Sequence, residues 1–339
     1  METQVIDQMG RGLRDLRISV TDRCNFRCTY CMPKEVFGAG YRYLNRTELL
    51  SFEEIERLVR IFAGYGVRKI RFTGGEPLVR RDLEQLIRMV LSVPGIEDVS
   101  LTSNASLITQ ERAASLYEAG IRRINVSLDA MDDQTFMAIN DVGASVQSVL
   151  DGIAAAQSAG IAGVKVNAVI KQGVNEHAIL PLVEQFRGSG VILRFIEFMD
   201  VGNHNGWDKS SVISSREILK TISEQHPLEP VDANYHGEVA QRWQYIDGAG
   251  EIGVISSITQ PFCGGCHRAR LSAIGQLFTC LFASEGTDLR AWLRDGSTDD
   301  QIDQRLRQLW QRRDDRYSEI RFTEPMANRQ KVEMSYIGG

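Results

Sequence analysis

The sequence predicts an α/β fold: an incomplete (β/α)6 barrel of the TIM type, with a C-terminal α+β region covering its open side. Strand-like and helix-like segments alternate between residues 16 and 198, which is typical of a parallel sheet with helical crossovers. Six strand–helix units are too few for a closed eight-stranded barrel. Beyond about Val201 the alternation stops, so a different kind of structure is expected there.

The barrel elements follow from local patterns. Ser51 and Glu54 form a capping box, which begins a helix that ends near Gly64. Basic and apolar residues alternate in the next strand, so Lys69 and Arg71 share one face. The expected strands lie at residues 16–20, 67–73, 98–103, 122–128, 163–170 and 191–198. The further helices lie at about residues 82–92, 109–119, 145–159 and 176–187.

The last third of the chain is expected to contain shorter elements. We predict short antiparallel strands at residues 239–247, 251–258, 268–273 and 276–282. Two helices are predicted at about residues 286–294 and 299–312. The chain therefore divides into a barrel, residues 1–210, and a C-terminal region, residues 211–339, which is expected to cover the barrel's open side.

The composition is that of a globular protein, with 43% hydrophobic and 24% charged residues. A net charge of −5 makes a general nucleic-acid binder an unlikely class. Apolar runs stay well short of the ~18 residues that cross a bilayer. The acidic N-terminus has no apolar signal core, so we expect a cytoplasmic protein that binds neither membranes nor nucleic acid.

Three cysteines, Cys24, Cys28 and Cys31, lie on one segment directly after the first strand. Thiolates are soft ligands that suit zinc or iron–sulfur clusters. A closed zinc site or an ordinary cubane cluster takes four protein ligands, and no fourth lies nearby in the sequence. Three thiolates on a four-iron cluster leave one iron open. Three buried core thiols are the simpler alternative, but core residues have no reason to gather on one loop.

This C-x3-C-x2-C spacing, with Tyr30 before the last cysteine, resembles the radical S-adenosylmethionine (SAM) superfamily. The resemblance implies a barrel of the radical SAM type and a 4Fe–4S cluster whose open iron is chelated by SAM. Gly74-Gly75-Glu76-Pro77 strengthens it, because this segment follows the second strand at the same rim. Alone it would be interpreted as a turn, although paired glycines also let the backbone approach a ligand closely.

A second triplet consists of Cys263, Cys266 and Cys280. With His267 it matches a c-type haem attachment pattern, which we reject because no export signal is present and Cys280 would be ignored. A zinc site with His267 as the fourth ligand is a stronger alternative. A second three-cysteine cluster with an open iron would use all six cysteines, and triplets in a reducing compartment indicate metal.

Basic residues are the third feature of the sequence. Lysine and arginine are rarely buried without partners, so for any single one a solvated or salt-bridged side chain is the simpler interpretation. Six of them occupy strand positions, and together they favour a polyanion such as a triphosphate. They are Lys69, Arg71, Lys165, Arg194, Arg268 and Arg270.

Longer segments narrow the resemblance. They occupy residues 17–33, 71–77, 194–199, 263–271 and 334–339. Together they resemble the molybdenum-cofactor biosynthesis protein A family, radical SAM enzymes that cyclise GTP, over essentially the whole chain. The resemblance implies two 4Fe–4S clusters, and a 5′-deoxyadenosyl radical from SAM that abstracts the ribose C3′ hydrogen of GTP. The C3′ radical then attacks guanine C8.

The resemblance also implies site residues. The two clusters would be held by Cys24, Cys28 and Cys31, and by Cys263, Cys266 and Cys280. SAM would contact Tyr30, Gly75, Ser127 and Met199. GTP would contact Arg17, Lys69, Arg71, Thr102, Lys165, Arg194, Arg268 and Arg270. The residues expected to act in catalysis are the cysteines of the first cluster, Arg268, Arg270, Gly338 and Gly339.

The implied partners are an external one-electron donor and a downstream cyclic pyranopterin monophosphate synthase, with a possible homodimer. The chain departs from the family pattern at His267, Ala105, Asp200 and residues 140–145. No departure removes a ligand or a basic anchor. His267 could ligate the second cluster and close it, and the sequence leaves this open.

Three other functions remain to be weighed. A radical SAM paralogue with an auxiliary cluster could act on a peptide or another small molecule, although Arg17, Lys165 and the glycine tail argue against it. A zinc-stabilised interaction module without catalysis is another alternative. It would be a colourless protein, whereas a protein with iron–sulfur clusters would be brown. A two-cluster electron-transfer protein does not explain why each triplet lacks a fourth ligand.

Overall fold

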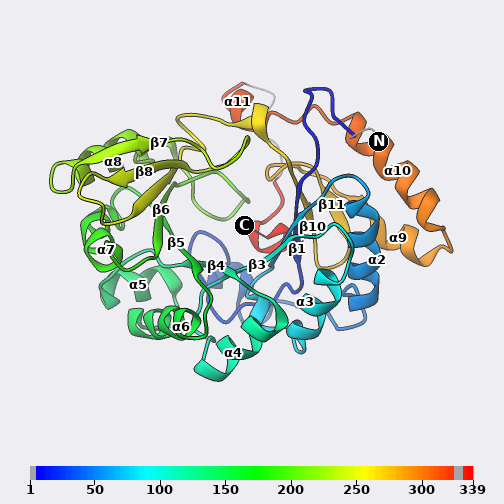
Figure 1. The fold of residues 1–339 in the computed structure, drawn as a ribbon, viewed down its shortest axis with the longest axis horizontal. Coiled ribbons are helices and arrows are strands. Elements are labelled where there is room, and N and C mark those ends of the chain that lie inside the picture. Colours follow the sequence, from blue (N-terminus) through cyan, green and yellow to red (C-terminus); the bar gives the residue numbers. More distant parts are fainter. Residues whose placement is uncertain (1–4, 324–330, 339) are drawn as a thin grey trace.

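The computed structural model describes residues 5–323 and 331–338. A curved sheet surrounds its centre, and helices cover the outside (Figure 1). All six expected barrel strands are present: β1 (Asp15–Ser19), β2 (Lys69–Thr73), β3 (Asp98–Ser103), β4 (Arg123–Ser127), β5 (Gly163–Ile170) and β6 (Ile192–Glu197). The expected helices are α2 (Phe52–Ala63), α3 (Leu83–Leu91), α4 (Gln110–Ala119), α6 (Val146–Ser158) and α7 (Ile179–Phe186). Helices that the sequence analysis missed are α1 (Lys34–Phe37), α5 (Asp133–Asn140), α8 (Ser215–Ser223), α11 (Tyr317–Ile320) and α13 (Met334–Ile337).

The C-terminal elements extend the same sheet. The strands are β7 (Leu228–Val231), β8 (Gln241–Tyr245), β9 (Glu251–Ile255), β10 (Arg268–Leu271), β11 (Gln276–Phe278) and β12 (Thr287–Asp288). The helices are α9 (Leu289–Arg294), α10 (Asp299–Gln311), α11 (Tyr317–Ile320) and α13 (Met334–Ile337). Over the described residues, twelve strands form one sheet in the order β12-β11-β10-β1-β2-β3-β4-β5-β6-β9-β8-β7. Since β12 and β7 are edge strands, the prediction of an incomplete barrel is confirmed.

Two strands that we predicted to be antiparallel, β9 and β10, each pair in parallel with the neighbouring barrel strand. β9 pairs in parallel with β6, and β10 pairs in parallel with β1. Each is antiparallel only on its outer side, β9 to β8 and β10 to β11. The prediction was wrong for the inner edges because the residues of a strand do not reveal the direction of a neighbour distant in sequence.

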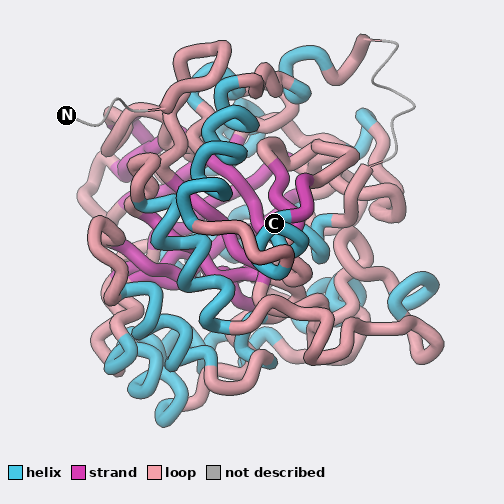
Figure 2. Tube along the Cα trace, turned by 90° about the vertical axis from the view of Figure 1, so that its right-hand side faces the viewer, coloured by secondary structure: helices cyan, strands magenta, loops and turns pink. Residues whose placement is uncertain are grey.

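The end of the chain returns to the middle of the ring. Helix α13 contacts β1, and the C-terminal end lies beside the strands in both views (Figures 1 and 2). On the outside, α10 packs on α2. Of the helices in residues 5–323 and 331–338, none is long and apolar enough to cross a bilayer.

The period of two along the strands separates core from interior. On β1, Leu16 and Ile18 are fully buried in the apolar core, which also contains Leu58 and Phe62 of α2. Arg17, which lies between them, is on the opposite face of the sheet and lines a cavity inside the ring. The helices therefore cover an apolar outer face of the sheet, while the inner face remains polar.

A buried carboxylate ties the end of β6 to the C-terminal region. Glu197 is fully buried, and its Oε1 accepts hydrogen bonds from the Ser215 amide at 2.8 Å and the Thr259 hydroxyl at 2.6 Å. Its Oε2 accepts from the amides of Ile258 and Thr259, both at 2.9 Å. One side chain thus fixes the start of α8 and the turn after β9.

Replacing Glu197 by alanine leaves these four donors without their acceptor. We expect E197A to lower the free energy of unfolding by about 3 kcal/mol or more. The matched control is E118A on α4, because Glu118 is exposed and should change stability by no more than about 0.5 kcal/mol. Urea denaturation measures both, and equal effects would contradict the assigned role of Glu197.

Candidate active site

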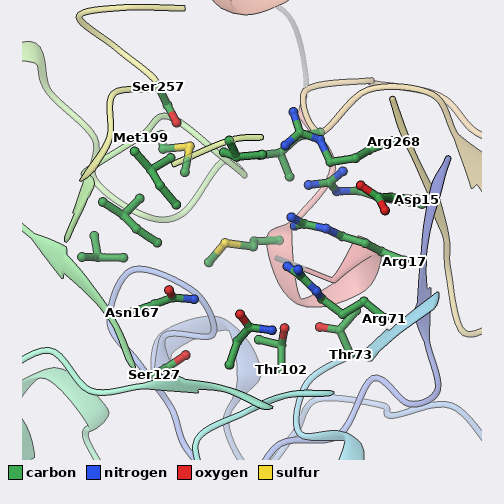
Figure 3. A pocket seen from close by; sticks show the side chains of 18 of the residues that line it. Asp15, Arg17, Arg71, Thr73, Thr102, Ser127, Asn167, Met199, Ser257 and Arg268 are labelled. Atoms are coloured by element: carbon green, nitrogen blue, oxygen red, sulfur yellow. The ribbon is translucent and has the colours of Figure 1, made fainter. Parts of the chain in front are cut away.

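The interior of the ring contains a cavity of about 330 Å³. It is lined by both cysteine triplets and by most of the basic residues singled out in the sequence. Arg17, Arg71 and Arg268 point into it from one side, and Ser127, Asn167 and Met199 lie on the opposite side (Figure 3). The predicted residues among its lining are Arg17, Cys24, Cys28, Tyr30, Cys31, Lys69, Arg71, Gly75, Thr102, Ser127, Arg194, Met199, Cys263, Cys266, Arg268, Arg270 and Cys280.

The first triplet lies on the loop after β1. The backbone turns tightly there, since the amides of Cys31 and Met32 both donate to the Cys28 carbonyl, at 2.9 and 2.8 Å. The Phe26 amide donates to Cys24 Sγ at 3.3 Å. Burial raises the pKa of the Cys24 thiol to about 11, and it raises the pKa values of Cys28 and Cys31 well above their ordinary range. These thiols need a positive partner to ionise.

Gly75 places the second rim segment directly against this loop. A Cβ at this position would lie 2.3 Å from the Arg23 carbonyl oxygen, so only glycine allows the approach. The neighbouring Glu76 accepts from the Leu78 amide at 3.1 Å, the Ser103 hydroxyl at 2.9 Å and the Asn104 amide at 2.8 Å. Burial outweighs these donors and raises the pKa of Glu76 to about 7.

The second triplet lies on the strand connections around β10. Burial acts to raise the pKa of the Cys266 thiol, but Arg268 and Arg313 together lower it to about 6. Arg268 Nη2 donates to Cys266 Sγ at 3.4 Å. This thiol is therefore prepared to bind as a thiolate, whereas burial raises the pKa of Cys280 to about 12.

Two buried arginines hold the backbone at all three positions of the second triplet. Arg11 Nη1 donates to the Cys263 carbonyl at 2.8 Å. Arg313 donates to the carbonyls of Cys266 and of Thr279, which precedes Cys280, both at 3.1 Å. Asp7 pairs with both guanidiniums, at 2.6 and 2.8 Å. The loops are thus fixed by groups that the sequence patterns did not reveal.

The donor sets fit clusters better than single ions. Within the described part of the chain, no three His, Cys, Asp or Glu side chains come together closely enough to hold one metal ion. Each triplet instead borders the common cavity, which leaves room for a group larger than one ion. Three thiols that face an open cavity suit an iron–sulfur cluster with one open iron better than a closed zinc site, which takes four protein ligands.

His267 is turned away from this cavity and is not among its lining residues. Its Nδ1 lies 3.0 Å from the Gly12 carbonyl oxygen, and its ring centre is 5.5 Å from that of His236. A Cβ on Gly237 would be 2.7 Å from Nε2. The ring therefore packs against the loop after β7, and the geometry does not favour a fourth cluster ligand.

The sheet register gathers the arginines into a row. Arg270 of β10 is opposite Arg17 of β1, and Arg17 is opposite Arg71 of β2. Asp15 lies in the adjacent layer, opposite Arg268 and Lys69. Burial and the neighbouring arginines lower the pKa of Arg17, and burial lowers the pKa values of Arg71 and Arg270 to about 10. This row concentrates positive charge on the cavity wall inside the ring.

The opposite wall is polar and less charged. Tyr30 donates from its hydroxyl to Asp129 Oδ2 at 2.8 Å, and the Val169 amide donates to Asp129 Oδ1 at 2.8 Å. Burial raises the pKa of Asp129 to about 6. Lys165 was predicted to join the basic group, but it is not among the residues that line the cavity.

The C-terminal tail enters the ring. Gly338 has φ +69°, and a Cβ there would lie 2.1 Å from Thr73 Cγ2 and 3.0 Å from Ser19 Oγ, so this position requires glycine. Met334 of α13 lines the cavity. The prediction for Gly339 lies outside the described residues.

The other three departures from the family pattern lie in well-defined surroundings. Asp200 is buried and accepts from the Tyr317 hydroxyl and Lys331 Nζ, both at 2.8 Å, so it ties the C-terminal segment to the end of β6. Ala105 is buried with φ +61°, a conformation that glycine adopts more easily. In residues 140–145, the Asn140 side chain caps its own turn by bonding to Ala144.

Several cavity residues were missed by the sequence analysis. One signal could have found part of them, because Arg123, Asn125 and Ser127 alternate along β4 on one face, as Lys165 and Asn167 do along β5. Residues on loops had no comparable signal. The missed residues include Asp15, Thr73, Arg123, Asn125, Asp129, Asn167, Tyr235, Glu238 and Ser257.

Comparison with known structures supports the fold. The chain is similar to Streptococcus suis SuiB bound to S-adenosylmethionine, with a TM-score of 0.57 and 16% identity over 91% of this chain and 68% of that one. SuiB bound to its precursor peptide SuiA gives a TM-score of 0.60 and 14% identity over 94% and 67%. At such identities the likeness concerns the fold alone.

Comparison with protein families and curated sequences is more specific. Residues 18–186 match the model of the Radical SAM superfamily, and residues 191–319 match that of Molybdenum Cofactor Synthesis C. The GTP 3′,8-cyclases of Staphylococcus aureus strains JH9 and Newman are each 48% identical over 342 residues, covering 100% of both chains. With the two cysteine triplets and the arginine row in one cavity, these matches lead to one conclusion. The chain belongs to the GTP 3′,8-cyclase family of the radical SAM superfamily.

Proposed function

We propose that this chain converts GTP to (8S)-3′,8-cyclo-7,8-dihydroguanosine 5′-triphosphate, the first step of molybdenum-cofactor biosynthesis. The observation that carries the proposal is the row of Arg270, Arg17 and Arg71, which faces the same cavity as both cysteine triplets. A buried row of cations requires a polyanion, and a triphosphate is the polyanion of this family's substrate.

The cofactors are two 4Fe–4S clusters and SAM. The first cluster is assigned to Cys24, Cys28 and Cys31, and the second to Cys263, Cys266 and Cys280. When bound, the first cluster with SAM supplies a 5′-deoxyadenosyl radical, and the second supplies an open iron for the guanine. Tyr30, Gly75, Ser127 and Met199, which line the cavity, are assigned to SAM.

The chain's own residues position the substrate. Thr102 and the basic residues Arg17, Lys69, Arg71, Lys165, Arg194, Arg268 and Arg270 are assigned to GTP. Arg268 already donates to Cys266 Sγ, so it can hold the substrate close to the second triplet. Holding the ribose at a fixed distance from the first triplet is the main catalytic task of the protein, because the radical chemistry is the cofactor's.

Exclusion of water is the second task. A reactive primary radical must be kept from side reactions, and a closed interior achieves this. Gly338 fits between Ser19 and Thr73 at the rim, which supports a role for the Gly338-Gly339 tail inside the active site. We assign residues 1–210 to the radical SAM barrel and residues 211–339 to the region that carries the second cluster.

The same function implies partners. We infer an external one-electron donor, a cyclic pyranopterin monophosphate synthase that consumes the product, and a cytoplasmic location, with a homodimer as the suggested assembly. The reaction requires reducing equivalents, and its product is a reactive nucleotide that a following enzyme must take up.

The test is 5′-deoxyadenosine formation by anaerobically reconstituted protein, given SAM and a reductant, with and without GTP. We expect strongly GTP-dependent SAM cleavage, with GTP consumed and a cyclised nucleotide formed. SAM cleavage that does not depend on GTP would instead indicate a radical SAM paralogue that acts on another substrate. No cleavage by iron-loaded protein would return the first triplet to a structural role.

Lys165 lies outside the cavity lining but interacts electrostatically with Arg194 and Arg123, so we expect it to give phosphate binding a pH dependence. Burial, with the charges of Arg194 and Arg123, lowers the pKa of Lys165 to about 8. Only the protonated amine attracts phosphate, so a bound polyanion raises this pKa. Affinity for inorganic tripolyphosphate should therefore fall as the pH rises above about 8, by at most about tenfold per pH unit.

Titration calorimetry between about pH 7 and about pH 9.5 measures this fall. The control is K165R, whose guanidinium stays protonated over the whole range and corrects for titration of the ligand itself. We expect a flatter profile for K165R than for the natural protein. Parallel profiles would show that Lys165 does not act on the phosphates.

A further inference from the structure

The loop between β7 and β8, residues 232–240, contacts Lys69 and Arg194, two of the basic residues that line the cavity. Three of its residues, Tyr235, Glu238 and Val239, line the cavity. The loop turns back on itself, because the Glu238 amide donates to the Tyr235 carbonyl at 3.2 Å. This turn brings Tyr235 and Glu238 to the cavity together.

Glu238 provides a carboxylate beside one of these basic residues, Arg194. Its side chain is only 4% exposed, and its Oε1 lies 3.6 Å from Arg194 Nη2. Its Oε2 accepts from the Asn234 amide at 2.8 Å, which orients the carboxylate. Burial lowers the pKa of Arg194, and the negative charge of Glu238 is the largest influence acting against that. Glu238 acts in the same direction on Lys165.

Tyr235 covers a second cation. Lys69 Nζ is 3.9 Å from the centre of the Tyr235 ring, which is the geometry of a cation–π contact. The loop thus partners two residues, Lys69 and Arg194, that we assign to the triphosphate. A phosphate that approached Lys69 or Arg194 would therefore encounter a side chain, Tyr235 or Glu238, that already contacts that cation.

We propose that Glu238 is a resident counter-ion of Arg194 that the triphosphate displaces, so that the loop at residues 232–240 rearranges when substrate binds. This inference rests on the proposed function, because it takes the substrate to be a polyanion at these cations. A carboxylate and a phosphate cannot share Arg194 without repulsion, and a buried carboxylate cannot remain there unpaired. Glu238 therefore lowers the affinity for phosphate while it keeps Arg194 paired in the absence of substrate.

The test is the affinity of E238Q for inorganic tripolyphosphate and for GTP, measured by titration calorimetry on reconstituted protein without magnesium. Removing the competing charge should tighten both by about fivefold, the worth of one partly buried ion pair. E238A should also bind both ligands more tightly, which would show that the effect does not come from the glutamine amide introduced in E238Q. Guanosine, which has no phosphate, should bind all forms equally.

The matched control is E229Q, which makes the same charge change on β7 at an exposed side chain outside the cavity lining. It should leave the affinities unchanged. Unchanged or weaker tripolyphosphate binding by E238Q and E238A would overturn the proposal, and weakening seen only with added Mg²⁺ would identify Glu238 as a metal ligand instead. If the natural protein binds neither GTP nor tripolyphosphate, the proposed function itself fails and this inference falls with it.

Discussion

The repulsion within the row Arg270–Arg17–Arg71 is the constraint on which the rest of the site depends. Parallel pairing of β10, β1 and β2 places these side chains directly opposite one another. Like charges in such positions destabilise a sheet, and burial increases the cost. Asp15, in the adjacent layer, partly offsets it for Arg17 and Arg71. The negative charges of Cys266 and Cys280 act in the same way on Arg270. An anionic ligand would offset the repulsion that remains.

Rigid supports hold the walls of this charged interior, and two of them, Glu76 and Arg313, also line it. Glu197 fixes the end of β6, Glu76 fixes the ends of β2 and β3, and Arg11 with Arg313 fixes the second cysteine triplet. Each support uses a buried charged group with several hydrogen bonds. The cavity residues can therefore stay in place even where they repel one another.

The parts of the structure that depend on local sequence were predictable. Strand and helix patterns located the barrel elements, and the period of two placed Lys69 and Arg71 on one face, which lines the cavity. The parallel pairing of β9 and β10 was not predictable, because it joins segments far apart in the chain. For the same reason the sequence did not reveal Arg313, which contacts the backbone at two cysteine positions. Spacing identifies cysteine ligands, but it does not identify the groups that hold their loops.

The most direct test of the whole account is the fate of one hydrogen atom. With the ribose of GTP between the arginine row and the first cysteine triplet, its C3′ hydrogen is the one abstracted. GTP deuterated at C3′ would be turned over by reconstituted protein, and the 5′-deoxyadenosine would be analysed by mass spectrometry. We expect the deuterium to be transferred into 5′-deoxyadenosine. Unlabelled 5′-deoxyadenosine, formed while GTP is consumed, would contradict this placement of the substrate.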